Sequence, residues 1–360
     1  MPPANGRSKP VISELARAAG VSPTTVSHVF NKPERVAAAT RERVLKAAAE
    51  LGYTGPNPTA RQLRRGRADA VGVLYTDELG FAFEDPATAS ILGGLSRVCG
   101  ARDLNLLLVP LGPSSSGARS AALASAAVDG FVVYSVPRDA PGLDLVLNRG
   151  LPTVIIDSPQ DVPTASFVGL DDRGATRALT EHLLQLGHRR IGIISSRLGT
   201  APYNGPPGPD RWREAPYVII ANRIRGVHDA TGAAPGDLPL EERFDNTAES
   251  GAQALHDLLD RHPDLTAVCC LTDVLALGAL TAAAQRGLQV PEDLTITGWD
   301  DLPEARRSGL TTIGQPLAGK GQMAGELLIE LTATLSPRRV TLPTSIEIRR
   351  TSGPPPLARP

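Results

Sequence analysis

The sequence predicts a small all-α head that precedes a larger α/β body of two doubly wound lobes. Charge separates the two parts: residues 1–67 contain 12 Lys or Arg against 4 Asp or Glu, a net charge of +8, whereas the remainder contains 25 against 34, a net charge of −9. Near the same place, helical spacing of apolar residues gives way to short strands that alternate with helices. A chain of 360 residues is long enough for two or three packed units.

Residues 11–31 are predicted to form two short helices joined by a tight turn, a helix–turn–helix. Apolar residues recur at helical spacing up to Gly20, which can adopt the left-handed C-cap conformation. Ser22 suits the N-cap of the second helix, and Pro23 suits its first position. That helix has an apolar face and a polar face: Val26, Val29 and Phe30 on the first, and Thr24, Thr25, Ser27 and His28 on the second. Such a pair presents its second helix to the major groove of DNA, although an ordinary helical hairpin has the same local pattern.

A third helix is predicted over residues 41–52, because Val44, Ala48 and Leu51 share one face and Gly52 can end it. This helix should close a small core over the first two. The head is therefore expected to be a three-helix domain over residues 1–55.

Residues 56–67 form a short basic segment between the head and the body. Asn57 and Pro58 suit an N-cap and a first helical turn, but the helix that follows can have two turns at most and is not stable alone in water. A flexible linker is one interpretation. The other is a hinge helix that folds on DNA, with Leu63 inserted between base pairs in the minor groove. Both can hold in different states.

Composition limits the class of protein. A basic head on an acidic body is typical of a DNA-binding domain joined to a part that does not bind DNA, although a solvated basic face is an alternative. The three cysteines have no metal-ligand spacing, no nucleotide-binding or hydrolase motif occurs in the required context, and neither a signal sequence nor a membrane span is evident. We therefore expect a cytoplasmic protein that is not an enzyme, has no catalytic residues, needs no metal or cofactor, and has no membrane partner.

The motifs AGVSxxTVSxVxN, TRxRVxxAxxELGY and PNxxARxL, within residues 11–67, resemble the lac repressor and purine repressor (LacI-type) family. The resemblance implies a headpiece, a hinge helix, and a homodimer that reads a near-palindromic double-stranded operator. It places base reading on Pro23, Thr24 and His28. Val11 and Ala37 depart from the family's pattern, which has hydroxyl residues at these helix starts. The DNA-contacting residues expected from the motifs are Ser22, Pro23, Thr24, Thr25, Ser27, His28, Asn31, Ala60, Arg61, Leu63 and Arg64.

From Ala70 the chain alternates between apolar strands and amphipathic helices, which predicts parallel sheets with right-handed crossovers. The body, residues 68–360, is expected to form two lobes that resemble periplasmic sugar-binding proteins, and the motifs NRIRG, LTDVLALGAL, VPEDLTITGWDD and LTTIGQP carry that likeness. The N-terminal lobe is assigned to residues 68–171 and 302–329. The C-terminal lobe is assigned to residues 172–301 and 330–351.

Ligands of open α/β sheets bind beyond the carboxyl ends of the strands, so polar residues there are candidates for an effector site between the lobes. Asp157, Thr272 and Asp300 end predicted strands. The family resemblance adds Arg223, Asp300 and Thr272 as effector contacts and Phe83 as an aromatic wall. For Arg223 and Asp300 the alternative is a structural salt bridge, and for Asp157 it is a turn or cap. Asp273 is interpreted as the N-cap of the following helix.

Two segments are expected to lack regular structure. Residues 196–218 are rich in Pro and Gly and show no periodicity, so they are either a lid over the cleft or a disordered insert, and the insert is the preferred interpretation. The tail from Ser352 is also expected to be disordered.

These features together predict a ligand-regulated DNA-binding repressor whose effector is a sugar or a nucleobase. The alternative is a solute-binding protein of the periplasmic type, which would have no use for the head. The pattern leaves open which effector binds, whether it releases or tightens the complex with DNA, and which operator is read. The absence of a leucine heptad tail favours a dimer over a tetramer.

Overall fold

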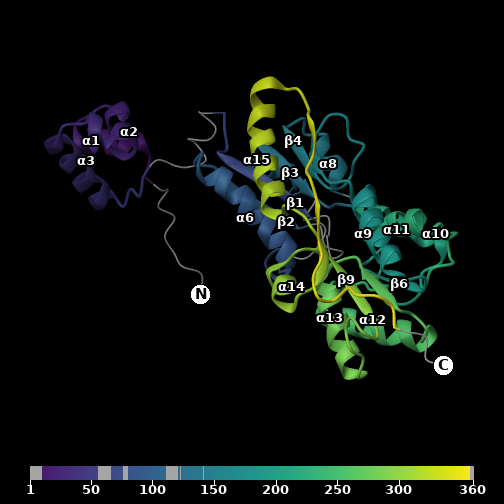
Figure 1. Ribbon diagram of the computed structural model, residues 1–360. Coiled ribbons are helices and arrows are strands. Elements are labelled where there is room, and N and C mark those ends of the chain that lie inside the picture. Colours follow the sequence, from purple (N-terminus) through teal and green to yellow (C-terminus); the bar gives the residue numbers. More distant parts are fainter. Residues whose placement is uncertain are drawn as a thin grey trace, which may run out of the picture. The chain divides into compact units, whose positions relative to one another are not determined.

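The computed structural model describes residues 10–55, 66–75, 80–110, 121, 123–140 and 142–356, apart from the side chains of Phe81 and Pro110 (Figure 1). The chain divides into two compact units, Met1–Ala68 and Asp69–Pro360, which we call the headpiece and the core. No helix among the described residues is long and apolar enough to cross a bilayer.

The described residues of the headpiece form three α-helices and one short 3-10 helix: α1 (Ile12–Ala19), α2 (Pro23–Asn31), η1 (Pro33–Arg35) and α3 (Ala38–Leu51). Gly20 and Gly52 have φ values of 64° and 67°, as expected for the left-handed residues that end α1 and α3. The helices bury a core around Leu15, Val26 and Val44. Leu51 does not belong to this core, contrary to the prediction. It is 40% exposed at the last position of α3, whereas Val44 and Ala48 are buried as predicted and Ala47 is buried beside them.

The first lobe of the core is a six-stranded, fully parallel sheet with helices on both faces. Its strand order is β11-β5-β4-β3-β1-β2. The strands are β1 (Ala70–Tyr75), β2 (Asn105–Pro110), β3 (Gly130–Tyr134), β4 (Thr153–Ile156), β5 (Ser166–Gly169) and β11 (Arg339–Thr341). The helices among the described residues of this lobe are α5 (Phe81–Glu84), α6 (Pro86–Gly100), α8 (Leu143–Leu147) and α15 (Leu317–Thr334). Side chains alternate between faces: Val132 packs in the cluster that includes α6 and α15, whereas Phe131 and Val133 pack with α8.

Helices α6 and α15 lie side by side on this lobe (Figure 1). Their approach depends on glycine, because a Cβ atom on Gly94 would lie 1.9 Å from the carbonyl oxygen of Ala318. A Cβ atom on Gly321 would lie equally close to the carbonyl oxygen of Ile91. This contact fixes the start of α15, which lies beside the cleft described below.

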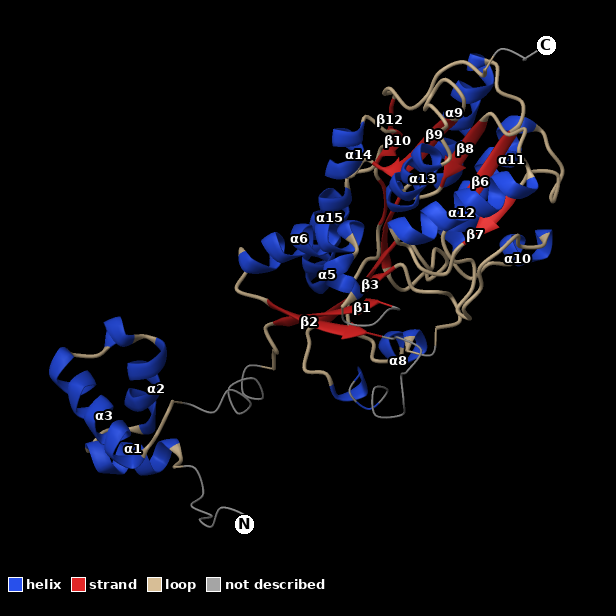
Figure 2. Ribbon diagram, turned by 90° about the horizontal axis from the view of Figure 1, so that it is seen from below, coloured by secondary structure: helices blue, strands red, loops and turns tan. Residues whose placement is uncertain are grey.

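The second lobe repeats the arrangement, with the strand order β12-β10-β9-β8-β6-β7 and only β12 antiparallel (Figure 2). The strands are β6 (Ile191–Ser195), β7 (Leu240–Glu242), β8 (Ala267–Cys270), β9 (Thr295–Asp300), β10 (Thr311–Gly314) and β12 (Ser345–Glu347). The helices are α9 (Asp172–Leu186), α10 (Pro209–Arg213), α11 (Val218–Thr231), α12 (Ala248–Arg261), α13 (Asp273–Gln285) and α14 (Pro303–Ser308). Helices α12 and α13 pack in one apolar cluster and α10 and α11 in another.

The chain passes between the lobes three times, after β5, after β10 and after β11. The lobe boundaries predicted for the last part of the chain are wrong in two places. β10, within residues 302–329, pairs with β9 and belongs to the second lobe, while β11, within residues 330–351, pairs with β5 in the first lobe. Both strands are short, and which sheet they join depends on distant hydrogen-bond partners rather than on their own sequence.

Residues 196–217 and the start of the tail are ordered, contrary to expectation. The first segment contains α10 and buries Leu198 and Trp212 against α11. In the tail, Gly353 donates from its amide to Thr295 Oγ1 (3.1 Å) and accepts from His188 Nε2 (2.8 Å). Tertiary contacts rather than local periodicity hold both segments.

Candidate functional site

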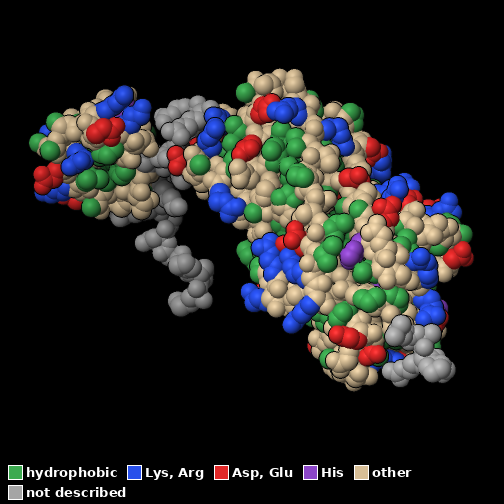
Figure 3. Space-filling model, viewed as in Figure 1, with side chains coloured by type: hydrophobic (Ala, Val, Ile, Leu, Met, Phe, Trp, Pro, Cys, Tyr) green, Lys and Arg blue, Asp and Glu red, His purple; other side chains and the backbone are tan. Residues whose placement is uncertain are grey.

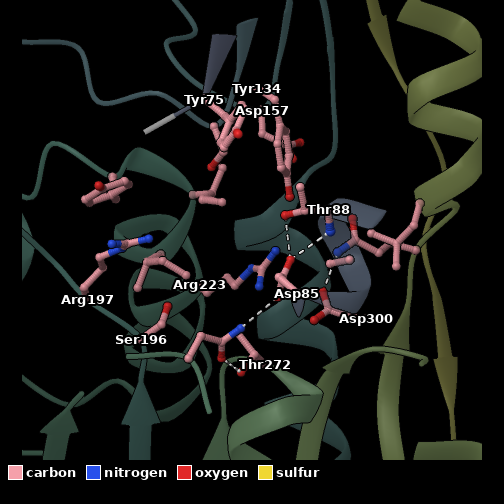
Figure 4. A pocket seen from close by; sticks show the side chains of 18 of the residues that line it. Tyr75, Asp85, Thr88, Tyr134, Asp157, Ser196, Arg197, Arg223, Thr272 and Asp300 are labelled. Atoms are coloured by element: carbon pink, nitrogen blue, oxygen red, sulfur yellow. Dashed lines mark hydrogen bonds between the residues drawn. The ribbon is translucent and has the colours of Figure 1, made fainter. Parts of the chain in front are cut away.

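A cleft between the two lobes of the core collects polar and aromatic side chains at the carboxyl ends of both sheets (Figure 4). Measured together with its open mouth, it has a volume of about 860 Å³. The first lobe and the crossing after β10 contribute Tyr75, Asp85, Ala87, Thr88, Tyr134, Ser135, Asp157, Gln315 and Leu317, and the second lobe contributes Ser196, Arg197, Tyr217, Ile219, Ile220, Arg223, Phe244, Asn246, Thr272 and Asp300. Such a position is where open α/β sheets bind ligands.

Arg223 of α11 lies at the base of this cleft and is almost fully buried. Its Nε donates to Asp172 Oδ1 (2.9 Å) and its Nη1 to the carbonyl oxygen of Leu271 (2.7 Å). Its guanidinium carbon lies 4.0 Å from the centroid of the Trp299 ring. Arg223 therefore forms a structural salt bridge and also lines the cleft, so a structural role and an effector-binding role are compatible.

Asp300 ends β9 with a φ of 124°, which turns its carboxyl group toward the cleft. Burial raises its pKa to about 8, and the nearby Asp273 and Asp85 charges act in the same direction, whereas Arg223 and a hydrogen bond from Gln315 oppose the rise. Gln315 Nε2 donates to Asp300 Oδ1 at 2.5 Å. Gln315 Oε1 is buried and has no partner among the described residues. A protonated Asp300 at neutral pH can both donate a hydrogen bond to a ligand and accept one.

Asp157 follows β4 with a φ of 67° and faces the same cleft. Both of its carboxylate oxygens accept from Lys320 Nζ, at 2.7 and 2.9 Å. Lys320, on α15, is 1% exposed. Asp157 thus forms a turn and a buried ion pair at the wall of the cleft, and a ligand would meet an already neutralised carboxylate.

Thr272, rather than Asp273, caps α13. Thr272 Oγ1 accepts from the Leu275 amide (3.2 Å) and donates to Asn246 Oδ1 (2.7 Å). Asp273 lies one residue further on and is buried, where it accepts from the Leu302 amide (2.8 Å) and from Thr312 Oγ1 (2.6 Å). The interpretation of Asp273 as the N-cap is therefore wrong, because its carboxylate ties α13 to the residues around α14 and β10 instead.

Asp85 and Asn246 connect the two lobes across the cleft, and neither residue was predicted from the sequence. Asp85 N-caps α6, accepting from the amide and the hydroxyl of Thr88 at 2.8 and 2.6 Å. Asn246 Nδ2 donates to Asp85 Oδ1 (3.3 Å), and Asn246 Oδ1 accepts from Thr272. A signal for Asp85 was available, since an Asp followed by Pro is a typical helix start.

The structure does not place Phe83 where the resemblance did. Phe83 lies on the short helix α5 with 68% of its surface exposed, and it is not among the described residues that line the cleft. The aromatic lining comes from other elements: Tyr75, Tyr134, Tyr217 and Phe244. Helix α5 turns Phe83 outward, so the aromatic wall of the cleft is formed by residues at strand ends and on the second lobe instead.

Lys and Arg side chains gather around α14 on the face shown in Figure 3, where Arg306 and Arg307 are exposed. Arg306 bonds to Asp301 (2.9 Å) and Arg307 to Glu304 (2.5 Å). Neighbouring carboxylates thus offset these charges, and this patch does not resemble a surface that tracks phosphates.

The polar face of α2 is the candidate DNA-reading surface. Ser22 Oγ accepts from the Thr25 amide at 3.0 Å and lies 2.9 Å from Thr25 Oγ1. Asn31 Nδ2 donates to the carbonyl oxygen of Ser27 at 2.8 Å. Pro23 and Thr24 are exposed, and His28 is partly exposed. Of the predicted DNA contacts, Ala60, Arg61, Leu63 and Arg64 lie outside the described residues.

The sequence matches two known family descriptions. Residues 11–57 match bacterial regulatory proteins of the lacI family, and residues 180–352 match a periplasmic binding protein-like domain. An HTH-type transcriptional regulator of Mycolicibacterium smegmatis is 41% identical over 96% of both chains. The regulator IpsA of Corynebacterium glutamicum is 39% identical over 89% of this chain and 90% of its own.

The chain belongs to the lacI family.

Two solved structures of this family are similar over nearly the whole chain. A transcriptional regulator CelR in complex with cellobiose is 29% identical, with a TM-score of 0.68, over 95% of this chain and 100% of its own. A lac repressor dimer bound to operator and the anti-inducer ONPF is 27% identical, with a TM-score of 0.74, over 96% and 99%. As a lacI-family member, the protein is a DNA-binding transcriptional regulator with a helix–turn–helix headpiece, and its relatives are regulators rather than enzymes.

Proposed function

We propose that the protein is a repressor whose binding to operator DNA is switched by a small hydroxylated molecule, a sugar or a related metabolite, in the cleft between the lobes. The observation that carries the proposal is that Arg223, Asp300 and Thr272 of the second lobe face Asp85 and Tyr134 of the first across one cleft. A ligand that contacts both lobes favours one lobe arrangement over another, and it can shift that equilibrium only by its difference in affinity between them. To reverse the occupancy of two states from 1:99 to 99:1, the binding free energies of the ligand for the two states must differ by about 5.5 kcal/mol.

The chemistry of the cleft favours a polyhydroxyl ligand. Carboxyl groups and an arginine bind vicinal hydroxyls, and aromatic faces stack on the apolar faces of a sugar ring. Asp85, Asp300 and Arg223 provide the first kind of contact, and Tyr134 and Phe244 the second. Among similar proteins, the CelR structure contains cellobiose, one relative is called a ribose operon repressor, and another is called PurR. A nucleobase therefore stays the second candidate, since an aromatic wall also stacks on a base.

On the DNA side, we propose that a homodimer reads a near-palindromic operator. Thr24 and His28 would contact base edges in the major groove, and Ser22, Pro23, Thr25, Ser27 and Asn31 would position α2 on the backbone and the bases. Ala60, Arg61, Leu63 and Arg64 would belong to a hinge helix that forms in the minor groove. Such a regulator acts where the chromosome lies, in the cytoplasm.

A two-part experiment tests this proposal. Thermal shift and calorimetry with ribose, glucose, cellobiose, glucose 6-phosphate and hypoxanthine would identify an effector class, because a ligand that binds only the folded state raises Tm. Operator sequences selected from a random DNA pool would then be titrated with and without the bound compound.

We expect deletion of residues 1–67 to abolish operator binding while the compound still binds. We expect His28→Ala to change the selected consensus. Sequence-specific DNA binding by the truncated chain, or an unchanged consensus in the His28 variant, would contradict the DNA-reading assignment. A solute-binding protein would bind the compound with no effect on DNA.

A further inference from the structure

The segment that connects β6 to α11, residues 196–217, is organised around one buried carboxylate. Glu242, at the end of β7, is fully buried. Its Oε1 accepts from the Leu198 amide (2.9 Å) and from Arg211 Nη2 (2.8 Å), and its Oε2 accepts from Arg211 Nε (2.5 Å). Its backbone exchanges two further hydrogen bonds with Gly205, at 2.8 and 3.0 Å. The start of the segment, its middle and helix α10 are therefore all attached to a single residue.

Packing and backbone chemistry make this segment stiff. Trp212 is buried and stacks on His228 of α11, with 5.0 Å between ring centroids. The guanidinium of Arg211 lies 4.3 Å from the centroid of the Tyr203 ring. Five prolines restrict the backbone of the segment even without its tertiary contacts: Pro202, Pro206, Pro207, Pro209 and Pro216.

Both ends of the segment reach the cleft. Ser196 and Arg197 line it at one end (Figure 4). Tyr217 lines it at the other end. The Arg197 guanidinium lies 5.5 Å from the centroid of the Tyr217 ring and 5.3 Å from that of Phe244, two residues after Glu242. These are cation–π distances, so Arg197 links the two ends of the segment to the loop after β7.

We propose that residues 196–217 are a specificity-determining wall of the effector cleft, and that Glu242 is the positioning residue that sets where Arg197 and Tyr217 stand. The inference rests on the proposed function, because it takes the cleft to be the effector site. Glu242 itself is not among the described residues that line the cleft. Its effect on a ligand must therefore pass through the wall: without its charge, Glu242 keeps one acceptor oxygen in place of the two that Arg211 and the Leu198 amide share, and both ends of the segment are loosened.

Adjacent residues on β7 provide a matched pair of variants. Glu242→Gln removes the charge that holds Arg211. Glu241→Gln changes an equally buried glutamate on the same strand, but Glu241 is paired with Arg243 and Arg261 and makes no hydrogen bond to the segment among the described contacts. Arg211→Lys weakens the same ion pair through its other partner, which is partly exposed. This variant replaces Glu242→Gln in the experiment if Glu242→Gln does not fold.

Two measurements on the full-length chain decide the proposal. Hydrogen exchange at the amides of Leu198, Gly205 and Tyr217 should rise at least tenfold in Glu242→Gln and Arg211→Lys but not in Glu241→Gln. Calorimetry with ribose, glucose, cellobiose, glucose 6-phosphate and hypoxanthine should show Kd values in Glu242→Gln and Arg211→Lys that differ from those of the wild type by tenfold or more. The factor should differ between the compounds that bind. Operator affinity without any compound should stay within twofold of the wild type.

The two proposals fail in different ways. If none of the five compounds binds the wild type, the proposed effector classes are wrong, and exchange at the amides of Leu198, Gly205 and Tyr217 then decides the role of Glu242. Unchanged exchange in both anchor variants would overturn the inference. Equal changes of Kd for every compound, or the same changes in Glu241→Gln, would also overturn it, because they indicate a general loss of structure rather than a wall that selects.

Discussion

The two lobes of the core have the same strand order and contribute differently to the cleft. In each sheet the strand that opens the lobe, β1 or β6, lies second from one edge, and the edge strand at the other side comes from the end of the chain. The first lobe neutralises its buried charge internally, through Asp157 and Lys320. The second lobe places its charges, Arg223 and Asp300, beside a long connection after β6 that also lines the cleft. One scaffold thus carries two different sets of polar side chains, at the carboxyl ends of its strands and on the helices beside them.

The buried ion pair of the first lobe should have the largest effect on stability. Lys320→Met leaves Asp157 buried without its partner, and we expect a loss of about 3 to 5 kcal/mol in the free energy of unfolding. Chemical denaturation measures this change. Adding Asp157→Asn, which tolerates a positive φ and removes the charge, should restore a large part of the loss. A loss below about 1 kcal/mol in the single variant would mean that Asp157 is not held as a charged pair.

The equivalent change in the second lobe should affect ligand binding as well as stability. Arg223→Lys keeps the charge but loses the two-pronged contact with Asp172 and Leu271 and the stacking on Trp299, so we expect a cost of about 2 kcal/mol in stability. The response of operator binding to the effector should also be lost. The control is Arg173→Lys, which alters the exposed pair with Asp229 between the neighbouring helices α9 and α11. A normal dose response in the Arg223 variant would remove this residue from the effector site.

Asp300 should make stability depend on pH through the second lobe. Its pKa is raised to about 8 in the folded chain, so folding favours the protonated form. This contribution to stability is complete when the pH lies below the pKa that Asp300 has in the unfolded chain. It is lost as the pH rises through about 8. Asp300→Asn should therefore flatten the pH dependence between pH 6 and 8, by at most about 1.4 kcal/mol per pH unit.

Some pH dependence should survive that substitution. Burial also raises the pKa of Asp273, to about 6, and this residue would still lose its contribution as the pH rises to that value. Denaturation series from pH 5 to 8 for both chains test the assignment. An unchanged slope above pH 6 would show that Asp300 is ionised in the folded protein.

The contact between the lobes should give the smallest effect. Asn246→Ala removes the hydrogen bonds to Asp85 and Thr272, and we expect a loss of about 1 kcal/mol in stability. Small-angle scattering should show a more open core, because this residue bridges the cleft. Asn222→Ala, which removes a contact with Arg225 on α11, should cost a similar amount without opening the core. Identical scattering from both variants would mean that Asn246 does not hold the lobes together.

The sequence alone predicted those parts of the molecule that depend on neighbouring residues. The ends of α1 and α2 follow from Gly20, Ser22 and Pro23, whose backbone preferences act within one turn. Asp157, Thr272 and Asp300 could be proposed because the ends of parallel strands meet at one edge of a sheet, and Arg223 because of the family resemblance. The structure brings all four to the cleft.

The parts that were missed depend on contacts between distant residues. Asn246 is recognisable only once Asp85 lies opposite, 161 positions away in sequence. Glu242 orders residues 196–217 from another strand, so the segment itself shows no periodicity that could have revealed its structure. Phe83 was placed by analogy, and the orientation of the short helix α5 decides its exposure. Strand membership of β10 and β11 also depends on long-range pairing.

The three passages of the chain between the lobes have a consequence for biosynthesis. A growing polypeptide completes the headpiece helices by Leu51, but it cannot complete either sheet of the core until β11 and β12 have been made, after residue 338. Domains generally fold as units, beginning with the N-terminal one during synthesis. The part that reads DNA therefore matures while the ribosome is still producing the part that senses the metabolite. A chain that ended before Arg339 would contain the headpiece helices but would lack an edge strand in each sheet of the core.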